Sequence, residues 1–163
     1  MEAGCTANVV LITPDKIYCA NAGDSRSILV KKNKDVIELS HDHKPGNPEE
    51  RTRIMNAGHF VEQDRVDGNL ALSRAFGDFG YKDRKQKSAA EQAVTANPDF
   101  EVVTRNDDDR FIICACDGIW DCLTNEDAAE LMAKKLDDKP PKPGKFSEPV
   151  GEMLDQILAP NVG

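Results

Sequence analysis

Two carboxylates follow an apolar run in this sequence, and their spacing could support metal chemistry. Phe111, Ile112 and Ile113 precede the stretch Cys-Ala-Cys-Asp-Gly-Ile-Trp-Asp, which places Asp117 and Asp121 on either side of a Gly-Ile-Trp segment. A short run of β-branched and aromatic residues is typical of a buried strand. Carboxylates at the point where such a strand meets a loop could bind a hard divalent cation, because Mg²⁺ and Mn²⁺ prefer oxygen ligands.

The same carboxylates also have a simpler interpretation. Asp-Gly is a common turn signal, so Asp117 and Gly118 could form a turn that Asp121 caps. Asp24 lies in Gly-Asp-Ser, whose composition is typical of a hairpin turn. Taken alone, these residues leave both interpretations open.

Four further segments favour the metal interpretation through a resemblance. They are Gly-Cys-Thr-Ala at residues 4–7, Ala-Gly-Asp-Ser-Arg at 22–26, Asp-His-Lys-Pro at 42–45 and Leu-Ala-Leu-Ser-Arg-Ala-Phe-Gly-Asp at 70–78. In this order and at these spacings, together with the stretch around Asp117, they resemble the metal-dependent protein Ser/Thr phosphatases of type 2C. The resemblance covers about residues 4–136.

The resemblance implies an activity, a cofactor and a set of ligands. Members of this family hydrolyse phosphoserine and phosphothreonine in phosphoproteins through a metal-activated water, with two or more Mg²⁺ or Mn²⁺ ions. Asp117 corresponds to a direct ligand of the catalytic metal pair. Asp121 and Asp24 correspond to carboxylates around a further, weaker metal site. No catalytic or substrate-binding residue is assigned from the sequence.

Some motifs of the resembled family have no counterpart in these residues. Family members carry an upstream Asp-Gly-His-Gly segment, an upstream arginine that holds the phosphate, and a later Gly-x-x-Asp-Asn-[Ser/Thr] segment. We therefore expect residues 1–163 to form a partial phosphatase domain that lacks its first strands, first helices and last strand, with little activity alone. The alternative is a non-catalytic half-domain or pseudophosphatase that acts as a binding module.

Composition limits the other functional classes. The chain has 163 residues, of which 39% are hydrophobic and 31% charged, as expected for one soluble domain with a core. Its 21 basic and 29 acidic residues give a net charge of −8, which suits cation binding and argues against nucleic acid as the main partner. There is neither a long apolar run nor a signal-peptide pattern, so we expect no membrane partner and a cytoplasmic location, with the nucleus as the alternative.

The cysteines and histidines do not form a recognisable zinc or disulfide pattern. Five scattered cysteines without Cys-x-x-Cys argue against both, and free thiols indicate a reducing compartment. Cys114 and Cys116 share a face of the expected strand, where we interpret them as small buried core residues. His41 and His43 could bind zinc, but a third ligand at recognisable spacing is missing.

The first half of the chain is expected to begin with an antiparallel meander. Apolar, β-prone runs predict strands at 5–12, 16–22, 25–30 and 35–39. Asn47 and Pro48 then start a helix that ends at Gly58, with Ile54 and Met55 toward the core. A hairpin is expected at 59–66 and 69–72, turning at Asp67 and Gly68.

The second half is expected to begin with a loop and end with helices. Residues 77–98 read as a loop with little regular structure, and strands follow at 100–104 and 110–116. Thr124 caps a helix to about Leu136, residues 137–149 form a linker, and a last helix covers about 150–159. The order of elements predicts an α+β fold. The resembled family adds a four-layer αββα antiparallel β-sandwich, incomplete in this chain.

Two further residues and one surface complete the expectations. Arg74 could form a buried pair with Asp78 or contact a phosphoprotein, and Trp120 is expected in the core beneath the metal loop. A sandwich that lacks strands would expose sheet edges and apolar faces, so we also expect self-association of this chain.

Overall fold

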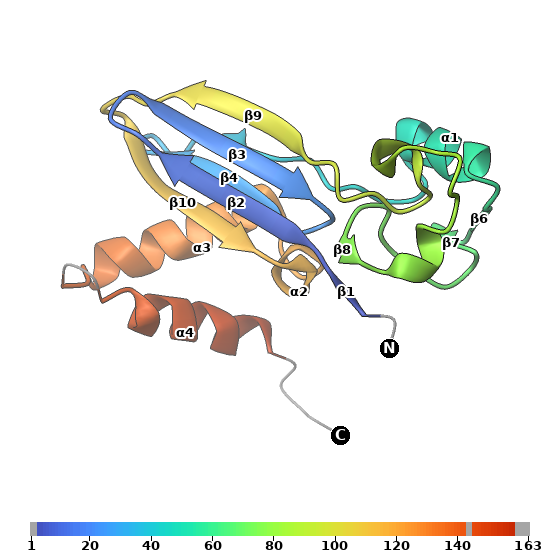
Figure 1. Ribbon diagram of the computed structural model, residues 1–163. Coiled ribbons are helices and arrows are strands. Elements are labelled where there is room, and N and C mark those ends of the chain that lie inside the picture. The colour runs from blue at the N-terminus through green and yellow to red at the C-terminus, as the bar shows by residue number, and fades with distance from the viewer. Residues whose placement is uncertain (1–2, 143–144, 159–163) are drawn as a thin grey trace.

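Two three-stranded antiparallel sheets form the centre of the protein. The computed structural model describes residues 3–142 and 145–158 (Figure 1). One sheet contains β2 (Ala7–Ile12), β3 (Lys16–Ala22) and β9 (Asp99–Thr104), with β3 in the middle. The other contains β4 (Arg26–Lys31), β5 (Val36–Glu38) and β10 (Asp109–Ala115), with β4 in the middle. The predicted antiparallel pairing is confirmed for β2 with β3 and for β4 with β5. The expected hairpin between the second and third strands is wrong, because β3 and β4 lie in different sheets and the turn at Gly23 and Asp24 carries the chain from one sheet to the other.

Strand β4 is buried on both faces, and its side chains point alternately into two separate parts of the core. Leu29 points into the space between the sheets, where it packs with Ile17, Cys19 and Leu39. The neighbouring side chains of β4 point the other way, as expected for the two-residue period of a strand. These side chains, Ile28 and Val30, pack against the helices that cover the second sheet.

Three helices follow the last strand. The short α2 (Asp117–Trp120) comes directly after β10, and α3 (Asn125–Asp138) and α4 (Ser147–Ile157) cover the outer face of the β10-β4-β5 sheet (Figure 1). Thr124 caps α3 as predicted, since its Oγ1 accepts a hydrogen bond from the Asp127 amide at 3.1 Å. Trp120 is buried in this core, so its prediction is confirmed.

The outer face of the β2-β3-β9 sheet remains exposed among the described residues. Val9, Leu11, Phe100 and Val102 lie on it with exposed fractions of 50–70%. The strand pairing places them in two rows through β3, because Val9 and Phe100 both face Ala20 while the other two face Tyr18. The described residues therefore supply two sheet layers and one helix layer of the expected four-layer sandwich.

A second region lies beside the sandwich and contains most of residues 40–98. It includes α1 (Pro48–Asn56), the hairpin of β6 (Val61–Glu62) and β7 (Arg65–Val66), and β8 (Phe76–Gly77), which pairs with β1 (Gly4–Cys5). Two 3₁₀ turns, η1 (Phe79–Tyr81) and η2 (Ala89–Glu91), follow. Ile54, Val66, Ala75 and Val94 form its own small core, and Figure 1 shows the region beside one end of the sheets.

Some predictions for this region were wrong in detail. The predicted turn at Asp67 and Gly68 is present, but the segment before it, expected as one strand at 59–66, is itself a hairpin that turns at Gln63 and Asp64, which both have positive φ. The Asp-Gly pair forms a second turn, which closes the Val66–Leu70 bridge. The helix α1 begins at Pro48 as predicted, but Met55 is exposed while Ile54 is buried.

Three predictions outside this region also need correction. Cys114 and Cys116 are exposed, although Ile112 on the same face of β10 as Cys114 packs into the core between the sheets. The last helix starts at Ser147 rather than at residue 150, and residues 77–98 contain the two 3₁₀ turns. Among the described residues, no helix is long and apolar enough to cross a membrane.

Candidate functional site

The turn between β3 and β4 buries Asp24. Gly23 begins this turn with a φ of +124°, a conformation that L side chains rarely adopt. An added Cβ at Gly23 would lie 2.3 Å from Thr6 Cγ2, so only glycine lets the turn pack this closely against the residue before β2. The carboxylate of Asp24 is only 6% exposed. A buried carboxylate needs a charged or hydrogen-bonding partner.

Lys44 supplies that partner. Its Nζ donates to Asp24 Oδ2 at 2.6 Å. Burial of Lys44 works against its charge, but the hydrogen bond to Asp24 and the charges of Asp24, Asp42 and Asp121 raise the pKa of Lys44 above its ordinary value. The structure thus brings Asp24 and Asp121 into the surroundings of one cation. The ammonium is hydrogen-bonded to Asp24 and stabilised by the charges of Asp42 and Asp121, so this position favours positive charge.

Hydrogen bonds from the backbone and side chains of His43 and Asn21 hold the segment that carries Lys44 against the same turn. The amide of His43 donates to the Gly23 carbonyl at 3.0 Å, and the amide of Gly23 donates to His43 Nδ1 at 3.1 Å. Because Nδ1 accepts a hydrogen bond, His43 carries its proton on Nε2, which lies 3.0 Å from Asp99 Oδ2. Asn21 adds hydrogen bonds to the carbonyls of Gly23 and His41. His43 is therefore part of the scaffold that positions Asp24.

Asp117 begins α2, and Asp121 caps its C-terminal end one helical turn later. The amide of Asp121 donates to the Asp117 carbonyl at 2.7 Å, and both side chains are exposed. The buried side chain of Trp120 anchors this turn to the end of β10, because its Nε1 donates a hydrogen bond to the Ala115 carbonyl at 2.9 Å. No hydrogen bond or ion pair holds the Asp117 carboxylate within the described residues, so it is free to bind a ligand.

Arg26 lies next to Asp121 but is already fully engaged. Its guanidinium donates to both carboxylate oxygens of Asp42, at 2.8 and 2.9 Å, and to Asn125 Oδ1 at 2.7 Å. It also lies over the Trp120 ring at 5.2 Å from the centroid. The bond to Asp42 raises the pKa of Arg26. With Asp121 it lines a shallow polar hollow of about 460 Å³.

A buried charge network that the sequence analysis missed connects α1 to this site. Glu50 accepts hydrogen bonds from Arg53 at 2.8 and 2.9 Å, from Arg74 at 2.8–3.2 Å, and from Ser73. Arg74 also donates to Asp99 Oδ1 at 2.7 Å, and thus pairs with Glu50 and Asp99 rather than with Asp78 as predicted. The sequence held one signal, because Glu50 lies four residues before buried Ile54 on one helix face.

The ionisation of Glu50 follows from these contacts. Burial favours its neutral form, but hydrogen bonds from Arg53, Arg74 and Ser73 outweigh burial and lower the pKa of Glu50 to about 2. The same hydrogen-bonding effect lowers the pKa of Asp99 through His43 and Arg74, against its partial burial. The network is therefore charged at neutral pH, and it links α1 to the turn that carries Asp24.

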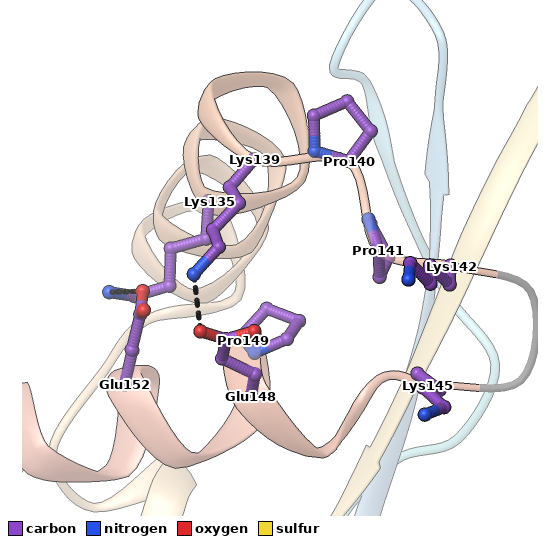
Figure 2. Close-up of a pocket in the computed structure, with 9 residues that line it drawn as sticks. All are labelled: Lys135, Lys139, Pro140, Pro141, Lys142, Lys145, Glu148, Pro149 and Glu152. Carbon is purple, nitrogen blue, oxygen red and sulfur yellow. Dashed lines mark hydrogen bonds and ion pairs between the residues drawn. The ribbon is translucent and has the colours of Figure 1, made fainter.

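Two other hollows are lined by none of the three aspartates. Figure 2 shows a pocket of about 310 Å³ between the end of α3 and the start of α4, lined by four lysines. Two of them are paired, Lys135 with Glu152 at 3.6 Å and Lys139 with Glu148. A second hollow of about 550 Å³ is apolar and runs along β10 and α4. None of the three predicted ligands lines either hollow.

The described residues fit a divalent cation by chemistry, although they do not complete a coordination shell. All three predicted ligands offer carboxylate oxygens, which suit Mg²⁺ or Mn²⁺. Lys44 shows that Asp24 attracts a cation. Within residues 3–142 and 145–158, no group of three or more His, Cys, Asp or Glu side chains converges to hold a metal ion.

Comparisons with known proteins agree with this arrangement. The family model of protein phosphatase 2C matches residues 1–161. "Probable protein phosphatase 2C 4" of Paramecium tetraurelia is 42% identical over 98% of this chain and 52% of its own length. "Protein phosphatase 2C homolog 3" of Schizosaccharomyces pombe is 52% identical over 82% of this chain and 32% of its own length. The chain thus spans about half or less of the length of these relatives.

Solved structures give the same result. A phosphatase from a pathogenic strain of Toxoplasma gondii superposes with a TM-score of 0.79 at 33% identity, over 87% of this chain and 43% of that chain. The serine-threonine phosphatase 2C from Toxoplasma gondii superposes with a TM-score of 0.67 at 26% identity, over 93% of this chain and 53% of that one. The motifs, the fold and the match over residues 1–161 lead to one conclusion: this chain belongs to the protein phosphatase 2C family.

Proposed function

We propose that these residues are part of a metal-dependent protein Ser/Thr phosphatase that hydrolyses phosphoserine and phosphothreonine in phosphoproteins. The observation that carries the proposal is the buried carboxylate of Asp24, which holds the Lys44 ammonium. The charge of Asp121 also acts on that ammonium, and Asp117 lies one helical turn before Asp121. Family membership supplies the reaction class. The free cysteines support a reducing compartment, and we place the protein in the cytoplasm.

Each of the three aspartates has a different part in this proposal. Asp117 has no other partner among the described residues and would bind the catalytic Mg²⁺ or Mn²⁺ ions. Asp24 and Asp121 would hold a further ion. Such ions, when bound, supply positive charge that stabilises the phosphoryl oxygens and lowers the pKa of water. The chain's own contribution is to hold Asp24 in a fixed turn and Asp117 on a rigid helical turn above Trp120.

We also propose that residues 1–163 form a partial phosphatase domain with little activity by themselves. The support is that no three metal-binding side chains converge among the described residues. Groups in one catalytic centre act as a unit, so an incomplete set loses most of the rate. Hydrolysis of para-nitrophenyl phosphate by this chain in millimolar Mn²⁺ tests the proposal, and vigorous metal-dependent turnover would contradict it.

The metal assignment has its own test. Isothermal titration with Mn²⁺ on Asp117→Asn and Asp24→Ala compares the two sites, with Asp107→Asn as the control because Asp107 lies in an exposed turn. We expect Asp117→Asn to lose the tighter binding and, in the complete domain, to lose activity, because Asn keeps the shape of Asp but not its charge. Asp24→Ala should affect only the weaker site. Unchanged Mn²⁺ affinity in Asp117→Asn would refute its assignment.

A non-catalytic binding module is the second candidate. The incomplete metal shell of the described residues favours it for this chain taken alone. The two candidates differ in what happens to a phosphothreonine peptide mixed with the complete protein and Mn²⁺. Release of inorganic phosphate supports the phosphatase, whereas peptide binding without phosphate release supports the binding module.

A further inference from the structure

Lys44 and a divalent ion would need the same place on Asp24. Lys44 Nζ lies 2.6 Å from Asp24 Oδ2, and the Asp24 side chain is only 6% exposed. A buried carboxylate with so little access has few directions from which to accept a cation. Two positive charges within ligand distance of one oxygen repel each other strongly where water is scarce. One occupant therefore excludes the other.

The neighbouring carboxylates strengthen the hold on Lys44 without offering it another partner. Asp42 already receives two hydrogen bonds from Arg26. Asp121 acts on Lys44 through its charge, and no hydrogen bond joins the two within the described residues. Lys44 is therefore retained mainly by Asp24, and it would be released mainly by a competitor for Asp24.

We propose that Lys44 is an internal competitor for the metal at Asp24, so that a divalent ion binds this carboxylate only when the ammonium leaves it. The inference rests on the proposed function, because it takes Asp24 and Asp121 as ligands of the weaker metal site. It adds that the weakness of this site is built into the fold by one lysine. Lys44 is thus a positioning residue that sets metal affinity.

Replacement of Lys44 by a metal ion at Asp24 should also affect the region that contains α1. Lys44 lies four residues before α1, and its carbonyl accepts a hydrogen bond from the Asn47 amide at 3.0 Å. Asn47 also donates to the Asp42 carbonyl at 2.8 Å, and Asp64 accepts a hydrogen bond from the Gly46 amide. Release of Lys44 removes the side-chain anchor at the point where the chain enters this region. Metal at Asp24 should therefore loosen residues 44–56.

Replacement of Lys44 by methionine tests the competition directly. Lys44→Met removes the charge and keeps the length, and Lys31→Met is the matched control because Lys31 is paired with Asp109 at 3.3 Å at the far end of β4. We expect Mn²⁺ to bind the weaker site of Lys44→Met roughly tenfold more tightly than the unchanged chain by isothermal titration. Lys31→Met should bind like the unchanged chain, and Lys44→Arg should keep the low affinity because it keeps the charge.

Several results would overturn the inference. Unchanged or weaker Mn²⁺ binding in Lys44→Met would show that Lys44 does not compete, and weaker binding would indicate that it only supports the fold. Asp24→Asn separates this failure from failure of the proposed site. If Mn²⁺ binding depends on Asp24 but not on Lys44, the metal site is supported and the competition by Lys44 is refuted. If Mn²⁺ binding is absent or independent of Asp24, both the metal site and the competition are refuted.

Amide hydrogen exchange gives a second readout that a purely structural role would not produce. In the unchanged chain, Mn²⁺ should speed exchange at residues 44–56, while in Lys44→Met exchange there should be fast before metal is added. Exchange at these residues that does not respond to Mn²⁺ in the unchanged chain would refute the coupling.

Discussion

Replacement of Glu50 by glutamine should strongly destabilise this protein, because it removes the negative charge at the centre of a buried charge network. Glu50 is 3% exposed and is the counter-charge of both Arg53 and Arg74, which are 15% and 9% exposed in their side chains. Glutamine keeps the shape, but it removes the charge and presents an NH₂ group to two guanidinium donors. Arg74 keeps Asp99, whereas Arg53 keeps only the backbone carbonyls of Ser73, Gln92 and Ala93.

The size of the effect follows from two independent arguments. Removal of one partner of a buried ion pair typically costs about 3–5 kcal/mol. A fall in the pKa of Glu50 from 4.5 to about 2 corresponds to about 3 kcal/mol of stability, because one pKa unit is about 1.4 kcal/mol. We therefore expect Glu50→Gln to lose about 3 kcal/mol of unfolding free energy at pH 7.

The pH dependence has a defined sign. A carboxylate with a lowered pKa in the folded state contributes stability above its unfolded pKa, and that stability is lost as the pH falls through the folded value. The contribution of Glu50 should therefore be complete above about pH 5 and disappear between about pH 4.5 and 2. The difference between the unchanged protein and Glu50→Gln should shrink over that range, because the variant has no proton to gain.

Urea unfolding followed by tryptophan fluorescence is a suitable assay, since Trp120 is buried. Glu49→Gln is the matched control, because Glu49 is an exposed carboxylate in the same first turn of α1 and shares its helix dipole. A loss below about 1 kcal/mol in Glu50→Gln, or an equal loss in both variants, would refute the view that the buried charge network stabilises the fold. A difference that stays constant down to pH 2 would refute the assigned pKa.

Two further changes test backbone geometry and the exposed sheet. Gly23→Ala should destabilise the protein by about 2 kcal/mol, because φ is +124° and the new Cβ would meet Thr6. Gly151→Ala on α4 meets nothing within 4 Å and should stabilise the protein by roughly 0.5–1 kcal/mol. Thermal unfolding of both variants tests this, and equal melting temperatures would contradict it. We also expect self-association at micromolar concentration, reduced by Leu11→Lys with Phe100→Lys, because both side chains are exposed on one apolar sheet face; a monomer of the unchanged chain in analytical ultracentrifugation would refute this.

Much of the fold could be predicted from local signals. Alternating apolar residues located the strands of the two three-stranded sheets to within one or two residues, and β3 matches the expected 16–22. The expected strands at 59–66 and 69–72 were not located in this way. Caps located the helix starts, as Pro48 and Thr124 show. These signals succeed because a strand period, a capping hydroxyl or a proline acts over a few residues. The layered architecture came from the family resemblance and could not be read from periodicity.

The failures have a common physical cause, which is competition between long-range partners. Arg74 had a nearby carboxylate in Asp78, but it pairs with Glu50 and Asp99, which are more distant in sequence. Cys114 was expected in the core but is exposed near the end of β10, although Ile112 on the same strand face packs between the sheets, and Cys116 lies beyond the strand at the start of α2. The lysine at Asp24 was also unforeseen, because a Gly-Asp-Ser turn does not reveal which cation faces it. The family resemblance pointed to the three aspartates, but nothing in the sequence indicated the partners of Asp24.

The strand pairing of the two sheets has a consequence for how this chain folds. Each sheet is completed by a strand from the later part of the chain, because β9 pairs with β3 and β10 pairs with β4. Leu29 and Ile112 face each other although they lie about 80 residues apart, and closing a loop of that length costs about 4 kcal/mol of chain entropy. Neither sheet can be completed before the intervening residues have been made and brought round. Folding should therefore be slow for a domain of this size, with the central strand β4 among the last segments of the newly made chain to leave water.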